Sequence, residues 1–348
     1  MQNSKKLIII AIILLAIITF VVIILLFIKQ KQQGETTNQT TTSKPIEEII
    51  NIAQTGVIFP GLAQGQQTIS FVDKSNPGFR TVNLTDKKMS ELIDAKNILE
   101  KGLVQKVIWS PSGQKVLIKI SEDQTKLVRF WLFDLKTKKE ELLNSDIQDL
   151  LWVSDEQILY SYMDPKNYQG SFNISSPNGT NWKKVFEIKD VIPKELFKYD
   201  QKLNVVLFGT GSDEINNQLY LSAIKSGKTD KLFDNYYSVY ANPLVDRVAI
   251  LTTADSKLLT LINASNKEKE EYKFDTEIRT VAVNEKIFAT TKNEPKNKIY
   301  SIDPENKIKT EIKYNTQVST IKPENLMPTK DGKTLYFTSD DFLYKLEM

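Results

Sequence analysis

The sequence contains neither cysteine nor histidine in its 348 residues. Without cysteine the chain forms no disulfide, no thiolate nucleophile and no cysteine-ligated metal site. Without histidine it lacks the commonest general base and the commonest metal ligand. Ser-His-Asp catalysis, histidine-ligated zinc hydrolysis and haem ligation by histidine are therefore excluded. The remaining catalytic options are carboxylate pairs, Ser-Lys dyads, tyrosine, or a hard metal held by oxygen ligands.

A strong charge of either sign is also absent. Lysine and arginine total 46 and aspartate and glutamate total 43, which gives a net charge of +3. Residues 1–35 hold four lysines and one glutamate, so this short stretch accounts for the whole excess. The rest of the chain is neutral and lacks the basic footprint of a nucleic-acid-binding protein. We therefore expect no nucleic-acid partner.

One long apolar run is present. Leu7 to Ile28 is an unbroken stretch of 22 residues whose only polar member is Thr19. About 20 apolar residues span the hydrocarbon core of a bilayer as a helix. No small-residue cleavage site follows the run, and this favours an uncleaved anchor over a signal peptide. The sequence predicts a single-pass protein of the cell membrane, with a short cytoplasmic tail at 1–6 and the body outside the cell.

A polar linker follows the predicted membrane helix. Residues 29–45 are rich in Thr, Asn and Gln and offer nothing apolar to bury. Such a composition is typical of a flexible tether. Residues 46–348 then form the predicted folded domain.

A repeat organises this domain. Its clearest copy is Val107–Ile118, where a strand ends at Trp109, a Ser-Pro-Ser-Gly turn follows, and a second strand begins. In each unit the second strand has an early apolar residue, and these residues are Ile69, Val116, Ile158, Val205, Val248, Ile287 and Leu335. A period of about 40–50 residues made of short strands is typical of a β-propeller. The predicted fold is all-β with seven blades, six or eight being the alternatives.

The two ends of the domain are expected to meet. The seventh unit stops at Met348, directly after its third strand, while Ile46–Ile52 precedes the first unit. We expect residues 46–52 to supply the outer strand of the last blade, because this closure removes exposed strand edges. In the first unit an outer strand is expected at Met89–Ile93, although Lys88–Gly102 would also suit a short helix.

Trp109-Ser110-Pro111-Ser112-Gly113 and the strand after it resemble the WD40-like repeat of TolB-type propellers. Asp331–Ser339 resembles the same repeat, and Leu151–Tyr160 is a degenerate copy. The other units match by spacing alone. The resemblance implies a propeller over most of residues 55–348 and a scaffolding role at a membrane or cell envelope. It does not extend to the hydrolase domain of prolyl-oligopeptidase-like enzymes.

Long loops that carry aromatic residues are the candidate binding sites. Tyr168, Phe172 and Trp182 lie in or near two long connections of the third unit, and Tyr237 lies in an aromatic stretch of the fifth. Such side chains suit a protein or glycan partner, although each could equally serve packing. Trp109 and Trp152 are expected to pack between blades. Gly209–Asn217 is rich in oxygen ligands, but lacks an EF-hand spacing, so we assign no metal site.

We therefore expect a membrane-anchored, extracytoplasmic β-propeller that acts as a non-catalytic scaffold for a protein or another ligand, without a cofactor. The alternative is a propeller enzyme that hydrolyses a carbohydrate or ester through two carboxylates. A sensor that signals through the membrane helix is a third possibility, although few residues precede that helix.

Overall fold

The computed structural model describes residues 47–348, except 54–55, 123–126, 189–190, 192, 201–204, 211–216, 227, 243–245, 293–296 and 316–320. The predicted membrane helix at 7–28 and the linker at 29–45 lie outside the described residues. Within the described residues no helix is long and apolar enough to cross a membrane. All described elements belong to one compact unit, Thr42–Met348.

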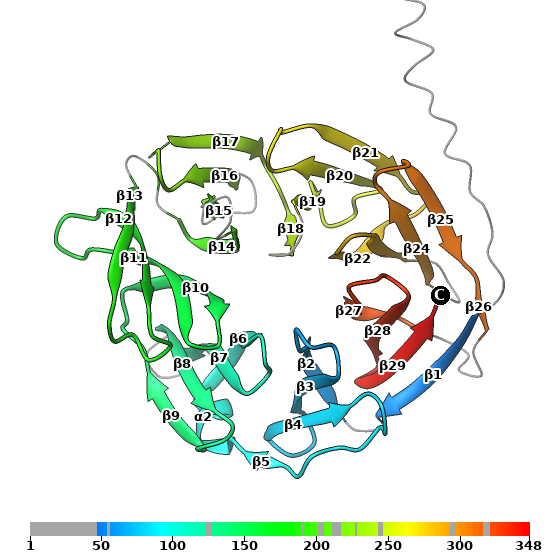
Figure 1. The fold of residues 1–348 in the computed structure, drawn as a ribbon, viewed down its shortest axis with the longest axis horizontal. Helices are drawn as coiled ribbons and strands as arrows, with labels where there is room; N and C mark the ends of the chain where they lie inside the picture. Colours follow the sequence, from blue (N-terminus) through cyan, green and yellow to red (C-terminus); the bar gives the residue numbers. More distant parts are fainter. Residues whose placement is uncertain are drawn as a thin grey trace, which may run out of the picture. The chain divides into compact units, whose positions relative to one another are not determined.

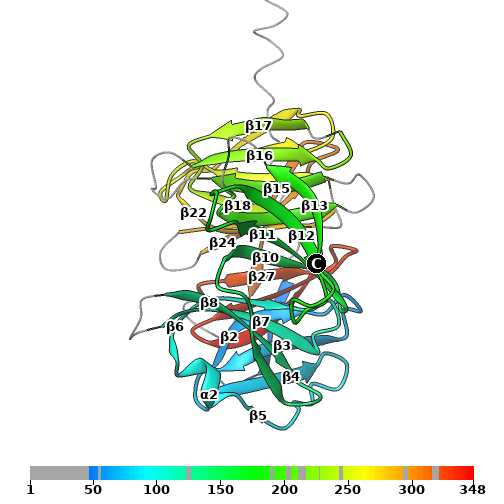
Figure 2. The same cartoon turned by 90° about the vertical axis from the view of Figure 1, so that its left-hand side faces the viewer.

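Seven antiparallel sheets stand in a ring around a common centre (Figure 1), and Figure 2 shows the ring from the side. Six blades have four strands each, ordered from the inner strand outwards. Blade 1 consists of β2 (Val57–Leu62), β3 (Thr68–Asp73), β4 (Gly78–Asn83) and β5 (Ile93–Asp94). Blade 2 consists of β6 (Gly102–Trp109), β7 (Lys115–Glu122), β8 (Val128–Asp134) and β9 (Lys139–Leu142), and blade 3 of β10 (Ile147–Ser154), β11 (Gln157–Met163), β12 (Gly170–Ser175) and β13 (Lys183–Ile188). Blade 4 consists of β14 (Glu195–Asp200), β15 (Val205–Thr210), β16 (Gln218–Ala223) and β17 (Lys228–Asp234). Blade 5 consists of β18 (Ser238–Ala241), β19 (Arg247–Leu251), β20 (Leu258–Asn263) and β21 (Lys269–Lys273), and blade 6 of β22 (Ile278–Val283), β23 (Ile287–Thr291), β24 (Lys298–Asp303) and β25 (Ile308–Ile312). The predicted all-β propeller with seven blades is confirmed.

Blade 7 combines the two ends of the domain. It contains β27 (Glu324–Pro328), β28 (Thr334–Ser339) and β29 (Phe342–Glu347), and β1 (Glu47–Ala53) lies antiparallel to β29 as its fourth strand. The short strand β26 (Tyr314–Asn315), which follows blade 6, pairs in parallel with the start of β1. This is the position that the sequence predicts for residues 46–52.

The core consists of seven apolar clusters, one at each junction between neighbouring blades. The second strands explain why the sequence pattern was so clear. Each second strand has its neighbouring blades on both faces, so it reads as a nearly continuous apolar run such as Val205–Phe208. Burial on both faces favours such runs over strict alternation.

Blade 1 departs from the sequence prediction at its outer strand. Met89 forms only an isolated bridge with Val82, and β5 contains only two residues. A short helix, α2 (Lys96–Leu99), follows and buries Ile98 completely in the cluster between blades 1 and 2. The outer strand expected at Met89–Ile93 is therefore replaced by an isolated bridge, the short strand β5 and the helix α2.

The alternating strand direction gives the ring two distinct faces. The front face is the face at which the inner strands begin; it also carries the turn between the second and third strands of each blade. We call the back face the one with the first-to-second and third-to-fourth turns, such as Ser110–Gly113. β1 runs antiparallel to β29, and its first residue, Glu47, pairs with Tyr314, two residues after the end of β25.

Candidate functional site

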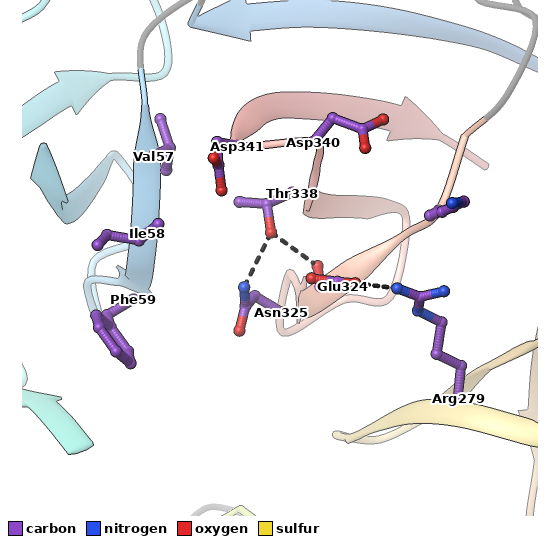
Figure 3. Close-up of a pocket in the computed structure, with 10 residues that line it drawn as sticks. Val57, Ile58, Phe59, Arg279, Glu324, Asn325, Thr338, Asp340 and Asp341 are labelled. Atoms are coloured by element: carbon purple, nitrogen blue, oxygen red, sulfur yellow. Dashed lines mark hydrogen bonds and ion pairs between the residues drawn. The ribbon is translucent and has the colours of Figure 1, made fainter. Parts of the chain in front are cut away.

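A pocket of about 530 Å³ opens on the front face where blades 6, 7 and 1 meet. Figure 3 shows its lining, which comes from the first residues of three inner strands and from the turn between β28 and β29. The lining residues are Val57, Ile58, Phe59, Arg279, Lys322, Glu324, Asn325, Thr338, Asp340 and Asp341.

A backbone bulge marks each of the three inner strands at this point. The pairing register shifts between Ile58 and Gly61 in β2, between Ile278 and Thr280 in β22, and between Glu324 and Met327 in β27. At each of these places the pairing with the second strand of the blade is interrupted. Phe59, Arg279 and Asn325 are among the residues without a partner on that strand. Similar bulges occur at the starts of β6, β10 and β14. A bulge bends its strand and re-aims a side chain, and here three re-aimed side chains line one pocket.

Phe59 forms the aromatic wall and has a strained backbone. Its φ is 48°, which a bulky residue rarely adopts. Trp109 of blade 2 holds this conformation, because its Nε1 donates to the Phe59 carbonyl oxygen at 2.8 Å. Gly61 makes room for the indole, since a Cβ at position 61 would lie only 2.3 Å from Trp109 Cδ1. The tryptophan predicted to pack between blades thus also shapes the pocket.

Blade 7 supplies the polar floor. Asn325 has a φ of 47°, and its Nδ2 donates to Thr338 Oγ1 at 2.9 Å. Thr338 is buried and donates in turn to the Glu324 carbonyl oxygen at 3.4 Å. Figure 3 shows the Asn325 amide oxygen on the side away from Thr338. The amide is therefore fixed, with one acceptor left for a ligand.

Asp340 and Asp341 form the two-residue turn between β28 and β29. Both have positive φ, 49° and 65°, as a type I′ hairpin turn requires. The Asp341 carbonyl oxygen accepts from the Val57 N–H of blade 1 at 2.7 Å, and its carboxylate meets Lys74 Nζ at 2.6 Å. The turn thereby joins blade 7 to blade 1 at the pocket.

The charges of the pocket are largely paired within the protein. Arg279 of blade 6 forms an ion pair with Glu324 of blade 7, and Lys74 pairs with Asp341. Lys322 and Asp340 add one further charge of each sign. The pocket therefore offers many hydrogen-bond donors and acceptors with little net charge.

A second charged group lies on the front face at blades 2 to 4. Asp149 is fully buried and accepts from Lys106 Nζ at 3.0 Å and from the Leu196 N–H at 2.8 Å. Burial raises the pKa of nearby Glu195, and the Asp149 charge adds to this, although Lys106 and Lys119 act in the opposite sense. These contacts join three blades.

The structure does not bring the predicted aromatic residues together. Tyr168 is 72% exposed on the front face, whereas Trp182 is 65% exposed on the back face, at the other end of β12. Phe172 is fully buried and packs against Phe208 with ring centroids 5.2 Å apart, so it belongs to the core and is not a surface contact. Tyr237 is 46% exposed at the start of blade 5, away from the pocket lining.

The Ser-Pro-Ser-Gly turn joins three blades. The Pro111 carbonyl oxygen accepts from the Gln64 N–H of blade 1 at 2.7 Å. Toward blade 3, the N–H and the hydroxyl of Ser112 donate to Asp155 Oδ1 at 3.0 and 2.6 Å. Burial alone would raise the pKa of Asp155, but these hydrogen bonds and Lys115 outweigh it and lower that pKa. The motif is structural.

Trp152 repeats the contact made by Trp109. Its Nε1 donates to the Ile108 carbonyl oxygen of blade 2 at 2.9 Å, and its ring packs on the cluster between blades 2 and 3. Both tryptophans therefore bridge neighbouring blades.

A metal site finds no support in the described part of the chain, where no three acidic side chains are placed to hold an ion. Most of the oxygen-rich segment Gly209–Asn217 lies outside the described residues.

Sequence reasoning missed the pocket residues. Phe59 lies in a unit that matches the repeat by spacing alone, and Asp340 and Asp341 directly follow the repeat copy Asp331–Ser339. Arg279 and Glu324 carried no local signal, because their pairing joins different blades.

Comparisons with known proteins show the fold. No family model matches the chain, and neither does any curated protein. Among solved structures, a prolyl endopeptidase matches with a TM-score of 0.59 and 12% identity over 84% of this chain, which spans 45% of that one. The Cps50 (Swd1) β-propeller domain of Myceliophteria thermophila matches with a TM-score of 0.57 and 10% identity, over 87% of this chain and 99% of that one.

The WD40 repeats of RRP9 match with a TM-score of 0.53 and 9% identity, over 86% of this chain and 97% of that one. At such identities the likeness shows the fold alone, a WD40-like propeller. Propellers serve both as enzymes and as scaffolds, so function has to be argued from the site.

Proposed function

We propose that the chain is a non-catalytic binding module that takes its ligand in the front-face pocket between blades 6, 7 and 1. One observation carries this proposal: of the six inner strands that bulge near their starts, three neighbouring strands contribute a residue of the bulge, Phe59, Arg279 or Asn325, to the lining of one pocket. Strained backbone conformations such as that of Phe59 persist only where the surroundings impose them, and they cluster at functional sites. The volume is also within the range of ligand pockets.

The charge pairing favours binding over hydrolysis. A carboxylate-based hydrolase needs two carboxyl groups that both face the substrate. Glu324 is in contact with the Arg279 guanidinium and Asp341 with the Lys74 ammonium. Both carboxylates are therefore engaged by cations of the protein.

The predicted anchor at 7–28 and the resemblance to TolB-type propellers support a place at the cell envelope.

Site-specific photocrosslinking tests the proposed binding function. A photoreactive residue would replace Asn325 in the pocket, or Tyr168 on the same face as a matched control, in the full chain expressed in its native membrane. We expect a defined crosslinked species from position 325 that is absent from position 168. Equal labelling at both positions, or turnover of a substrate that is lost in Glu324→Gln, would overturn the proposal. Membrane fractionation of the full chain, and of a chain lacking 7–28, tests the anchor separately.

A further inference from the structure

We propose that the pocket recognises a neutral carbohydrate segment, an inference that rests on the proposed binding function. The charges around the pocket sum to zero. Arg279 pairs with Glu324, Lys74 pairs with Asp341 from outside the lining, and Lys322 and Asp340 add one charge of each sign. A charged ligand entering a balanced site loses solvation and gains no matching counter-charge. A neutral ligand avoids this cost.

The lining of the pocket offers both hydrogen-bond acceptors and hydrogen-bond donors. Asp340, Asp341 and the free oxygen of Asn325 offer acceptors, whereas Arg279 and Lys322 offer donors. Carboxylate, amide and guanidinium groups are planar and can engage two neighbouring groups at once. A sugar presents adjacent hydroxyls, each of which both donates and accepts. This ligand chemistry matches both the acceptors and the donors of the lining.

One wall of the pocket is apolar. Val57, Ile58 and Phe59 line the side of the pocket that belongs to β2. Part of the Phe59 ring packs on the cluster between blades 1 and 2, and Trp109 fixes its backbone. An immobilised aromatic ring suits the C–H face of a sugar ring, because the ring face carries negative charge density. Polar groups on one side and an aromatic platform on the other match the two kinds of surface on a pyranose.

Binding of defined oligosaccharides to the full chain in nanodiscs tests this inference. Isothermal titration would use neutral hexasaccharides of α-glucan, β-glucan, xylan and N-acetylglucosamine, with hexalysine and hexaglutamate as charged comparators. We expect at least one neutral oligosaccharide to bind, with an affinity that changes less than about twofold between about 0.05 and 0.5 M NaCl. Asp340→Ala should weaken binding by about tenfold, whereas Tyr168→Ala should leave it unchanged.

The outcomes separate this inference from the proposed function. If no neutral oligosaccharide binds, or if a bound one is insensitive to Asp340→Ala and to Phe59→Leu, the carbohydrate inference is wrong. If a peptide binds instead and is displaced by the pocket variants, the carbohydrate inference fails while the binding function stands. Crosslinking that labels positions 325 and 168 equally removes both. Circular dichroism of each variant checks that the propeller remains folded.

Discussion

At the scale of single residues, the pocket depends on a chain of contacts between Gly61, Trp109 and Phe59. The glycine admits the indole, the indole N–H donates to the Phe59 carbonyl oxygen, and Phe59, with its strained backbone, lines the pocket. The sequence predicts that Trp109 packs between blades, and the structure places it there. It could not reveal the hydrogen bond to position 59, because the partner is a backbone atom 50 residues away.

Gly61→Ala should destabilise the propeller by about 2–3 kcal/mol, because the added methyl group collides with Trp109. Gly65→Ala is the matched control: nothing lies within 4 Å of a Cβ at that position, and it should be close to neutral. Urea unfolding followed by tryptophan fluorescence measures both. Equal stability of the two variants would show that the indole can move aside.

Trp109→Phe and Trp152→Phe should each lower the free energy of unfolding by about 1–2 kcal/mol, since each loses one N–H donor and some packing. Only Trp109→Phe should also speed hydrogen exchange in the segment around Phe59 and weaken ligand binding. Hydrogen exchange followed by mass spectrometry compares the pair. A pocket affected to the same degree by both variants would contradict the specific role of Trp109.

Asp155→Asn should make stability less dependent on pH at the acid end. The pKa of Asp155 is lower in the folded chain than its usual value, so the ionised carboxylate stabilises the fold above a pH of about 4. That contribution disappears as the pH falls through the folded-state pKa. Wild type should exceed the variant by about 1–2 kcal/mol at neutral pH, and the difference should vanish in acid. Glu156→Gln, at an exposed ion pair with Lys115, should show almost no difference at any pH.

At the scale of elements, the sequence predicted the second strands well: each of the seven apolar residues that mark the repeat lies in the second strand of its blade, because burial on both faces gives these strands long apolar runs. Outer strands were harder to predict, because their charged residues follow no such pattern. In blade 1 the outer strand β5 has only two residues, and the helix α2 that follows it buries Ile98. Tyr168 and Trp182 are close in sequence but lie on opposite faces, because one antiparallel strand separates the two turns.

The third-to-fourth turns show a further feature that local patterns conceal. Lys267 and Lys307 occupy the left-handed position of equivalent turns, with φ of 62° and 56°. Each extends to an acidic residue on the outer strand of the preceding blade, Asp230 at 2.9 Å and Glu270 at 3.3 Å. The sequence could not show that these turns connect blades. Pairs across a junction depend on the ring, which no local window contains.

At the scale of the whole molecule, closure depends on β1. Its alternating side chains enter two different junctions, with Ile49 in the cluster between blades 6 and 7 and Ile50 and Ile52 in the cluster between blades 7 and 1. The strand therefore seals both sides of blade 7. The same blade supplies Glu324, Asn325, Thr338 and both aspartates of the pocket.

Ile52→Ala should lower the free energy of unfolding by about 2–4 kcal/mol, because it leaves a cavity in a closed junction. Leu142→Ala on the outer strand β9 is the control, since this side chain is exposed and should change stability by less than about 0.5 kcal/mol. Chemical denaturation gives the difference. Hydrogen exchange should show blade 7 losing protection before blades 3 to 5, and uniform loss would mean that β1 is no special seal.

The position of β1 also sets the path of mechanical load. Residues 1–46 are joined covalently to the described structure at Glu47, so tension transmitted along the backbone of that segment enters the ring at β1. Pulling β1 away from β29 opens the blade that holds most of the pocket. A ligand that binds only the closed ring stabilises that ring by mass action, so an occupied pocket should resist a larger force than an empty one. The force needed to open the propeller would then depend on whether its pocket is occupied.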